Sequence, residues 1–260
     1  MNQTRNQCYS DTMAGHNKWS KIKHKKAKTD AQKGKFFSKM ARELTMAAKL
    51  GGGDDTMNPR LRLAIQKAKQ VNMPNENIKR AIQKGAGNDD GDQLEEMVFE
   101  AYCSFGVALI IEAVTDNKNR TVSNVKSALT KFSSSLATQG AVAYQFNRIG
   151  VISFDSISED TLIDIAIDAG AEDVITHLDG TVDVICQPTD LYTLQTVFDD
   201  QSLAYQSADL IYDSQSKITL TSEQAESILK LVDRLEDDDD VQMVYGNYDI
   251  PDDIIDRLSA

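Results

Sequence analysis

The spacing of apolar residues changes once along this chain, and the change limits what each part can fold into. Between residues 30 and 85, large apolar residues recur every three or four positions, which places them on one face of a helix. From residue 97 onward they come in short runs that are typical of strands, separated by further helical patterns. The segment GAGNDDGD at 85–92 divides the two parts and is predicted to be a linker.

Three amphipathic helices are predicted in the first part. The first begins near Asp30 and ends at the glycines of 51–53, because glycine accepts the left-handed conformation that follows a helix. Asn58 and Pro59 begin the second helix as cap and first-turn residue, and the third follows the break at Pro74. Lysine and arginine lie off the apolar stripes, so the sequence predicts a compact helical domain with basic outer faces.

The second part predicts α+β structure. Residues 149–212 follow the order β-α-β-β-α-β, which is the ferredoxin-like split arrangement. Around this segment we expect strands at 97–102, 107–114, 141–146 and 241–246, and helices at 119–132 and 221–236. In the helix at 119–132, the residues expected to face inward are Val122, Val125, Leu129 and Phe132.

The expected fold class is α+β, with an N-terminal three-helix domain followed by two ferredoxin-like α+β domains, one inserted in the other. The basic all-helical domain is predicted at 13–88. The last strand would complete the sheet begun at 97, so the outer α+β domain is predicted to be discontinuous and to comprise 93–147 and 214–260. The inserted ferredoxin-like domain is predicted at 148–213.

Charge divides the chain at nearly the same place. Residues 13–87 hold 18 Lys and Arg against 5 Asp and Glu, a net charge of +13, whereas residues 88–260 hold 9 against 34, a net charge of −25. A basic head on an acidic body is expected of a protein that touches a polyanion with one end only. The alternative is that the two parts neutralise each other, within the molecule or across a dimer.

The basic charge is densest in a lysine-rich arm at 16–35, HNKWSKIKHKKAKTDAQKGK, which carries eight lysines and the only tryptophan. No apolar face runs through residues 16–28, so this segment cannot bury itself. Its lysines would displace counterions from a polyanion. Trp19 is a candidate for stacking on an exposed base, with packing against the helical domain as the alternative. The predicted nucleic-acid-binding residues are His16, Lys18, Trp19, Lys21, Lys23, His24, Lys25, Lys26, Lys28, Lys33, Lys35, Arg42, Arg60 and Arg62.

Other classes of function lack their sequence signals. No apolar run approaches the ~20 residues that cross a bilayer, so no membrane partner is expected. The three cysteines form no CxxC pair, which suits a reducing cytoplasm and argues against a cysteine-ligated metal. No GxxxxGK[ST], GxSxG or HExxH motif is present. The sequence predicts a cytoplasmic protein that is not an enzyme and takes no cofactor, metal or small-molecule substrate.

Two polar segments in the second part receive structural interpretations. In DNKNRT at 116–121, Asp116 and Asn119 are expected to cap the following helix, and Arg120 to pair with a nearby acid. The five consecutive acids Glu236–Asp240 are predicted to form a solvated turn, because adjacent carboxylates at a helix end do not converge on one ion.

Several segments resemble the YebC/PmpR family. The stretch from MAGHNKWSKIKHKKAKTDAQKGK to GGGD closely resembles the family's amino-terminal signature. Further matches are NPRLRLAIQKAKQVNMPNENIKRAI, TDNKNRT, GVISF, AGAEDV and LEDDDDVQMVYGN, and together they cover nearly all of 13–250 in the family's order. The chain departs from the usual pattern at Cys103–Gly106, where a glycine-rich turn is common, and at Ser133–Ser135, where a glycine pair is common.

The resemblance implies an all-helical domain and two α+β domains in a cytoplasmic transcriptional regulator that binds DNA, with no enzyme activity. Some members of the family, including the mitochondrial translational activator, act on translation, and bacterial relatives are linked to the ribosome. Two functions therefore stay open: DNA binding through the basic arm and helical domain, and ribosomal RNA binding as a translation factor. A third is a protein–protein adaptor that works through its ferredoxin-like domains.

Overall fold

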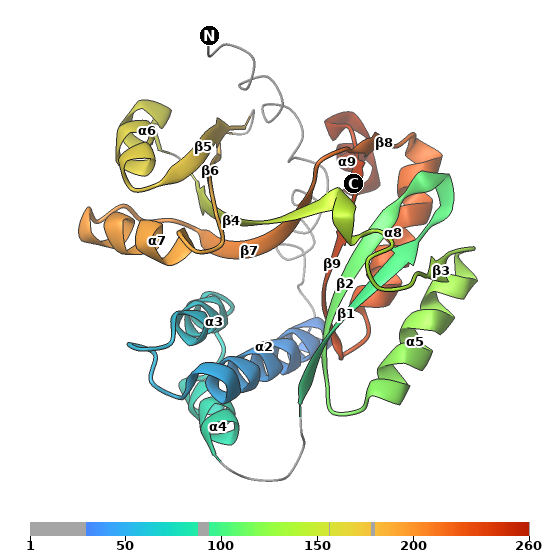
Figure 1. Ribbon diagram of the computed structural model, residues 1–260, viewed down its shortest axis with the longest axis horizontal. Coiled ribbons are helices and arrows are strands. Elements are labelled where there is room, and N and C mark those ends of the chain that lie inside the picture. The colour runs from blue at the N-terminus through green and yellow to red at the C-terminus, as the bar shows by residue number, and fades with distance from the viewer. Residues whose placement is uncertain (1–29, 88–93, 156, 178–179, 260) are drawn as a thin grey trace. The chain divides into compact units, whose positions relative to one another are not determined.

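The computed structural model describes residues 30–87, 94–155, 157–177 and 180–259 (Figure 1). These residues form two compact units. The inserted unit is Phe146–Lys217, and the main unit comprises the described residues up to Gln145 and from Ile218 onward. Within the described residues, no helix is both long enough and apolar enough to span a bilayer.

The main unit begins with three packed helices, α2 (Asp30–Gly51), α3 (Pro59–Gln70) and α4 (Asn75–Ala86). Leu44 and Leu61 are fully buried in their shared core, and each contributes about 1.5–3 kcal/mol through its removal from water. At Gly85 a side chain would place Cβ 2.2 Å from the carbonyl oxygen of Thr45, so α4 crosses α2 closely only because residue 85 is glycine.

Asn58 joins two of these helices, as its position before Pro59 predicts. Its side-chain oxygen accepts a hydrogen bond from the Leu61 amide at 3.1 Å and so caps α3. Its side-chain nitrogen donates to the carbonyls of Ala47 and Gly52, both at 2.8 Å, near the end of α2. One buried side chain therefore satisfies backbone groups at two helix ends.

The α+β part of the main unit is built on a four-stranded antiparallel sheet with the order β3-β1-β2-β9. Its strands are β1 (Glu95–Tyr102), β2 (Ala108–Thr115), β3 (Ser135–Leu136) and β9 (Val241–Gly246). Helices α5 (Lys118–Lys131) and α8 (Ser222–Glu236) pack on the same face of the sheet (Figure 1). The remaining elements are the short 3-10 turns Ser104–Gly106 and Ala143–Gln145, the parallel pair β8 (Ile218–Thr219) and β10 (Tyr248–Asp249), and α9 (Asp252–Ser259).

The inserted unit has the predicted order β4 (Phe146–Phe154), α6 (Glu159–Asp168), β5 (Ala171–Thr176), β6 (Val182–Cys186), α7 (Leu191–Asp200) and β7 (Ser207–Ser214). Its strands form an antiparallel sheet in the order β5-β6-β4-β7. Phe154 of β4 meets Phe198 of α7 edge to face, with ring centroids 5.2 Å apart. The predicted fold class, a helical region followed by α+β domains, is confirmed. The three-domain boundaries stay a prediction.

The strand predicted at 141–146 is wrong. Residues Ala143–Gln145 form a 3-10 turn, and β4 begins at Phe146. The buried carboxylate of Glu100 explains the difference, because it accepts hydrogen bonds from the backbone amides of Gly140, Val142 and Ala143. Because these amides donate to one carboxylate, they are not available to pair with a neighbouring strand.

The helix predicted at 119–132 is present as α5, but its inward face differs by one residue. Val122 is exposed, and Thr121 is fully buried in its place. Its cap is Asn117, whose side chain accepts from the Arg120 amide at 3.1 Å, and not Asp116 or Asn119. The predicted solvated turn at Glu236–Asp240 is also partly wrong, because Asp240 is only 2% exposed.

Candidate nucleic-acid interface

The predicted nucleic-acid-binding residues divide into three groups. His16, Lys18, Trp19, Lys21, Lys23, His24, Lys25, Lys26 and Lys28 lie outside the described residues. Lys33 lies in α2, and its side chain is not among those described. Lys35, Arg42, Arg60 and Arg62 are described, and each of the four contacts another part of the main unit.

Lys35 and Arg42 both reach the five acids at the end of α8 and just after it, which we call the acidic turn (Glu236–Asp240). The Lys35 ammonium lies 3.2 Å from the Asp237 carboxylate and 3.4 Å from the Asp237 carbonyl oxygen. The Arg42 guanidinium lies 3.3 Å from the Asp240 carboxylate and donates to the Asp239 carbonyl. Between them on α2, Lys39 donates to the Glu236 carbonyl at 2.6 Å. The stretch of α2 from Lys35 to Arg42 is therefore held against an acidic segment about 200 residues later in the chain.

Asp240 is also held by residues of α5 and β2. Arg120 donates to its carboxylate at 2.8–3.1 Å, and the hydroxyls of Thr121 and Thr115 contribute hydrogen bonds at 2.9 and 3.2 Å. Arg120 also bonds Asp116 at 2.6 Å, which lowers the pKa of that carboxyl. Hydrogen bonds to Asp240 and then Asp116 raise the pKa of Arg120. The expected pairing of Arg120 with a nearby acid is thus present.

Arg60 and Arg62 are also held within the main unit. The Arg60 guanidinium lies 2.9 Å from Glu43 and 2.5 Å from Glu96, so it links α3 to α2 and to β1. Burial lowers the pKa of Arg60, but the bonds and charges of the two glutamates outweigh it and leave the pKa above the usual value. Arg62 donates to backbone carbonyls of the loop at 55–56.

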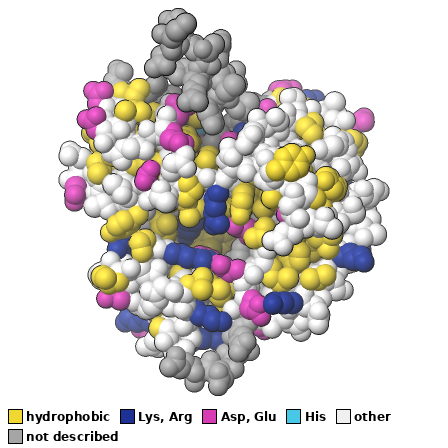
Figure 2. Space-filling view, viewed as in Figure 1, with side chains coloured by type: hydrophobic (Ala, Val, Ile, Leu, Met, Phe, Trp, Pro, Cys, Tyr) yellow, Lys and Arg dark blue, Asp and Glu magenta, His cyan; other side chains and the backbone are white. Residues whose placement is uncertain are grey.

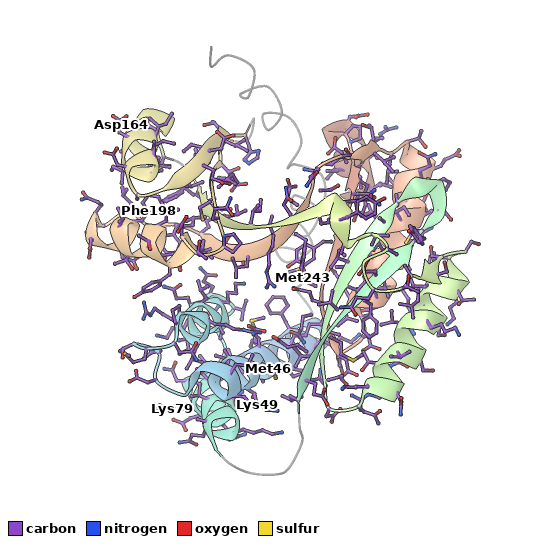
Figure 3. All side chains as sticks on the ribbon, viewed as in Figure 1. Met46, Lys49, Lys79, Asp164, Phe198 and Met243 are labelled. Carbon is purple, nitrogen blue, oxygen red and sulfur yellow. The ribbon has the colours of Figure 1, made fainter. Side chains whose placement is uncertain are left out.

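The helices also carry basic residues that the sequence prediction did not select. Lys69 lies in the last turn of α3, and Lys79, Arg80 and Lys84 lie on α4, all of them exposed. Figure 2 shows dark-blue side chains over the part of the surface that these helices form, and Figure 3 labels Lys79. Lys79 has only a weak surface pair with Glu76 at 3.8 Å. The sequence signal that could have identified these four basic residues is their position off the apolar stripes of the helices.

One apolar contact and one hydrogen bond attach α2 to the sheet region of the main unit. Met46 packs in a small buried cluster with Leu94 and Val114, and Lys49 donates to the Leu94 carbonyl at 2.9 Å. Met46 and Lys49 are labelled on α2 in Figure 3. These contacts lie after Arg42 in the helix, so they attach α2 without involving Lys35, Lys39 or Arg42.

The inserted unit brings together three residue types that often serve in catalysis. Asp183 is buried and accepts hydrogen bonds from the Ser153 hydroxyl at 2.5 Å and, on its other oxygen, from His177 at 2.9 Å. Serine and histidine both bond the carboxylate, so this is not the arrangement in which a base activates a nucleophile. Among the described residues, no group of three His, Cys, Asp or Glu side chains is arranged to hold a metal.

The described cysteines are also poor nucleophiles. Burial raises the pKa of Cys103 to about 11 and that of Cys186 to about 12. A thiol with such a pKa is almost entirely protonated at neutral pH.

Known proteins match both parts of the chain. Residues 17–88 match the family model described as the TACO1/YebC protein N-terminal domain, and residues 94–248 match the model described as the TACO1/YebC second and third domain. A "probable transcriptional regulatory protein" from Francisella tularensis subsp. novicida (strain U112) is 47% identical over 247 residues, which cover 95% of this chain and all of the relative. A protein of the same name from F. tularensis subsp. holarctica (strain LVS) matches to the same extent.

A solved structure agrees with this match. The crystal structure of a conserved hypothetical protein, Aq1575 from Aquifex aeolicus, is similar with a TM-score of 0.81 and 42% sequence identity, over 90% of this chain and 98% of that one.

Proposed function

We propose that this chain, which belongs to the TACO1/YebC family, regulates transcription by binding DNA through its basic arm and helical domain. The observation that carries the proposal is the division of charge, +13 for residues 13–87 against −25 for the remainder after residue 87. Such a distribution attracts a polyanion to one end of the molecule and repels it from the other. The name of its relatives, "probable transcriptional regulatory protein", supports the same class of function.

The proposed contact residues are those predicted from the sequence, from His16 to Lys35 together with Arg42, Arg60 and Arg62. The lysines of the arm would contact phosphates, and Trp19 would stack on a base. The exposed cations of α3 and α4, including Lys69 and Arg80, are added to this surface, since they lie on the same helical layer.

A second candidate is a ribosome-associated translation factor that binds ribosomal RNA through the same residues. The composition of the arm favours this candidate. The arm is rich in lysines that can bind phosphates, but Trp19 is its only large aromatic side chain for contacting a base. Sequence-specific DNA readout normally needs several side chains that reach base edges.

Crosslinking in cells, followed by separate sequencing of bound DNA and bound RNA, tests the two candidates. Enrichment of promoter DNA is the result expected for the transcriptional function. Enrichment of one ribosomal RNA region, with no promoter signal, would contradict it and support the translational one. A chain in which Lys25 and Lys26 are changed to glutamine should lose most of the signal. The matched control changes Lys126 and Lys131, two exposed lysines of α5, and should keep it.

A further inference from the structure

Three cations of α2 form a row that the acidic turn occupies. Lys35, Lys39 and Arg42 lie four and three residues apart, which places them on one face of the helix. The row spans roughly 10 Å at the helical rise of about 1.5 Å per residue. Phosphates of one nucleic-acid strand succeed each other about every 3.4 Å along the axis, so a row of this length can serve two or three of them.

The acidic turn presents this row with a comparable series of acceptors. The carbonyl oxygens of Glu236, Asp237 and Asp239 and the carboxylates of Asp237 and Asp240 all meet α2 cations. The Glu236 carbonyl ends α8, where the last carbonyls have no partner within the helix and carry partial negative charge. The acidic turn therefore offers α2 what a phosphate backbone would offer it.

The acidic turn has partners other than α2. Asp240, its buried member, retains Arg120, Thr121 and Thr115 as partners when Arg42 leaves. At the other end, the Lys35 and Asp237 side chains are 50% and 58% exposed, and exposed pairs of this kind contribute little. The contact with α2 can therefore open without leaving a buried charge unpaired.

We propose that the acidic turn is an internal competitor for nucleic acid, which holds Lys35, Lys39 and Arg42 until phosphates displace it. The inference rests on the proposed function and names a regulation of that same site. A ligand that reaches only the arm residues before Lys35 gains none of these three cations. A longer polyanion that can replace every acceptor of the acidic turn gains all three cations, so the contact favours extended nucleic acid over isolated phosphates.

The test compares two single substitutions in the full chain, Asp237→Asn and Asp238→Asn. Each removes one negative charge from the acidic turn. Asp237 contacts Lys35, whereas the Asp238 carboxylate accepts from Asn124 and from the Asp240 amide and does not touch α2. The probes are a fluorescein-labelled 20-base-pair DNA duplex and a single-stranded RNA 20-mer, with binding followed by anisotropy at low salt. We expect Asp237→Asn to bind about two- to fivefold more tightly than Asp238→Asn, because one exposed pair is worth about that factor.

A double-mutant cycle with Lys35→Gln gives a second readout. If Lys35 is shared between the acidic turn and phosphate, its loss should weaken binding more in the Asp237→Asn chain than in the parent. Equal affinities of Asp237→Asn and Asp238→Asn, or an additive cycle, would overturn the competition while leaving the proposed function intact. Failure of the parent to bind either probe would overturn the proposed function, and the competition with it.

Discussion

Asp237, near the start of the acidic turn, and Asp240, at its end, differ in what holds them. Asp240 is buried and bonded by an arginine and two threonines from the neighbouring helix and strand. Asp237 is more than half exposed, and its carboxylate bonds one lysine. The first contact belongs to the fold, because its loss would leave charges buried without partners. The second contact can open and close, and solvent, salt or a polyanion can shift the balance between its open and closed forms.

The largest effect is expected at the buried end. Replacing Asp240 by asparagine removes the charge that Arg120 and Arg42 share and should destabilise the main unit by about 3 kcal/mol. Urea unfolding followed by circular dichroism measures it. Asp239→Asn is the matched control, since this side chain is exposed, and should stay within about 0.5 kcal/mol. A similar small change for Asp240→Asn would erase the distinction between the two ends.

Glu100 tests whether a buried carboxylate can stabilise the fold without a cationic partner. Its carboxylate is held by backbone amides, and Glu100→Gln should cost about 2 kcal/mol, as expected for hydrogen bonds to a charged group. Burial raises the pKa of Glu100, but the amides of Val142, Gly140 and Ala143 outweigh it and leave the pKa below its usual value. The stabilisation is therefore complete above the unfolded pKa, about 4.3, and is lost as pH falls through the lower folded pKa.

The glutamine variant separates that contribution from other carboxylates. Stability of the parent and of Glu100→Gln should converge as pH is lowered from 6 to about 3, in urea titrations at each pH. A constant difference across this range would show that the carboxylate charge has no part in holding the loop.

A substitution that alters no charge serves as a reference for the charged positions above. Ser133 takes a left-handed backbone conformation with φ +53°, which glycine adopts without steric cost. Ser133→Gly should stabilise the chain by about 1 kcal/mol, and equally at low and high salt. Ser135→Gly, in strand β3, should instead destabilise it slightly. Loss of stability in Ser133→Gly would mean that the serine side chain contributes more than its backbone strain costs.

The smallest effect on stability is expected at the exposed end. Asp237→Asn should change the free energy of unfolding by less than about 0.5 kcal/mol, because Asp237 and its partner Lys35 are both at least half exposed. Thermal unfolding at 20 and 300 mM salt checks this, and the small difference should vanish at the higher concentration. A loss as large as that of Asp240→Asn would make the whole acidic turn part of the fold and leave nothing for a polyanion to displace.

Local chemistry predicted much of the fold. The Asn58–Pro59 pair gave the start of α3, and the Thr221 cap with Gln224 marks the start of α8 where the sequence predicts it. The β-α-β-β-α-β order of the inserted unit follows from apolar spacing together with turn residues such as Gly170. Each of these features depends on residues a few positions apart, which a sequence displays directly.

Three of the failures involve partners that are distant in sequence, whereas the choice of Asn117 over Asp116 or Asn119 as the cap of α5 is a local one. Thr121 displaces Val122 from the core because its hydroxyl bonds Asp240, which is 119 positions away. The turn at 143–145 replaces a strand because Glu100, about 40 positions away, accepts from the amides of Gly140, Val142 and Ala143. The acids at 236–240 look solvated until Arg120 and α2 are placed beside them. Their contact with Lys35 and Arg42 also gives part of the charge neutralisation within the molecule that the sequence left open.

The salt dependence of nucleic-acid binding tests the central claim most directly. The full chain is titrated with a 20-base-pair DNA duplex from 50 to 300 mM salt. If the arm and helical domain neutralise about five phosphates, log K should fall with log[salt] with a slope of roughly −4.5 on the duplex, or roughly −3.5 on a single strand. A flat response would contradict the account, because it would mean that the lysines of the arm and the cations of α2 do not meet phosphate.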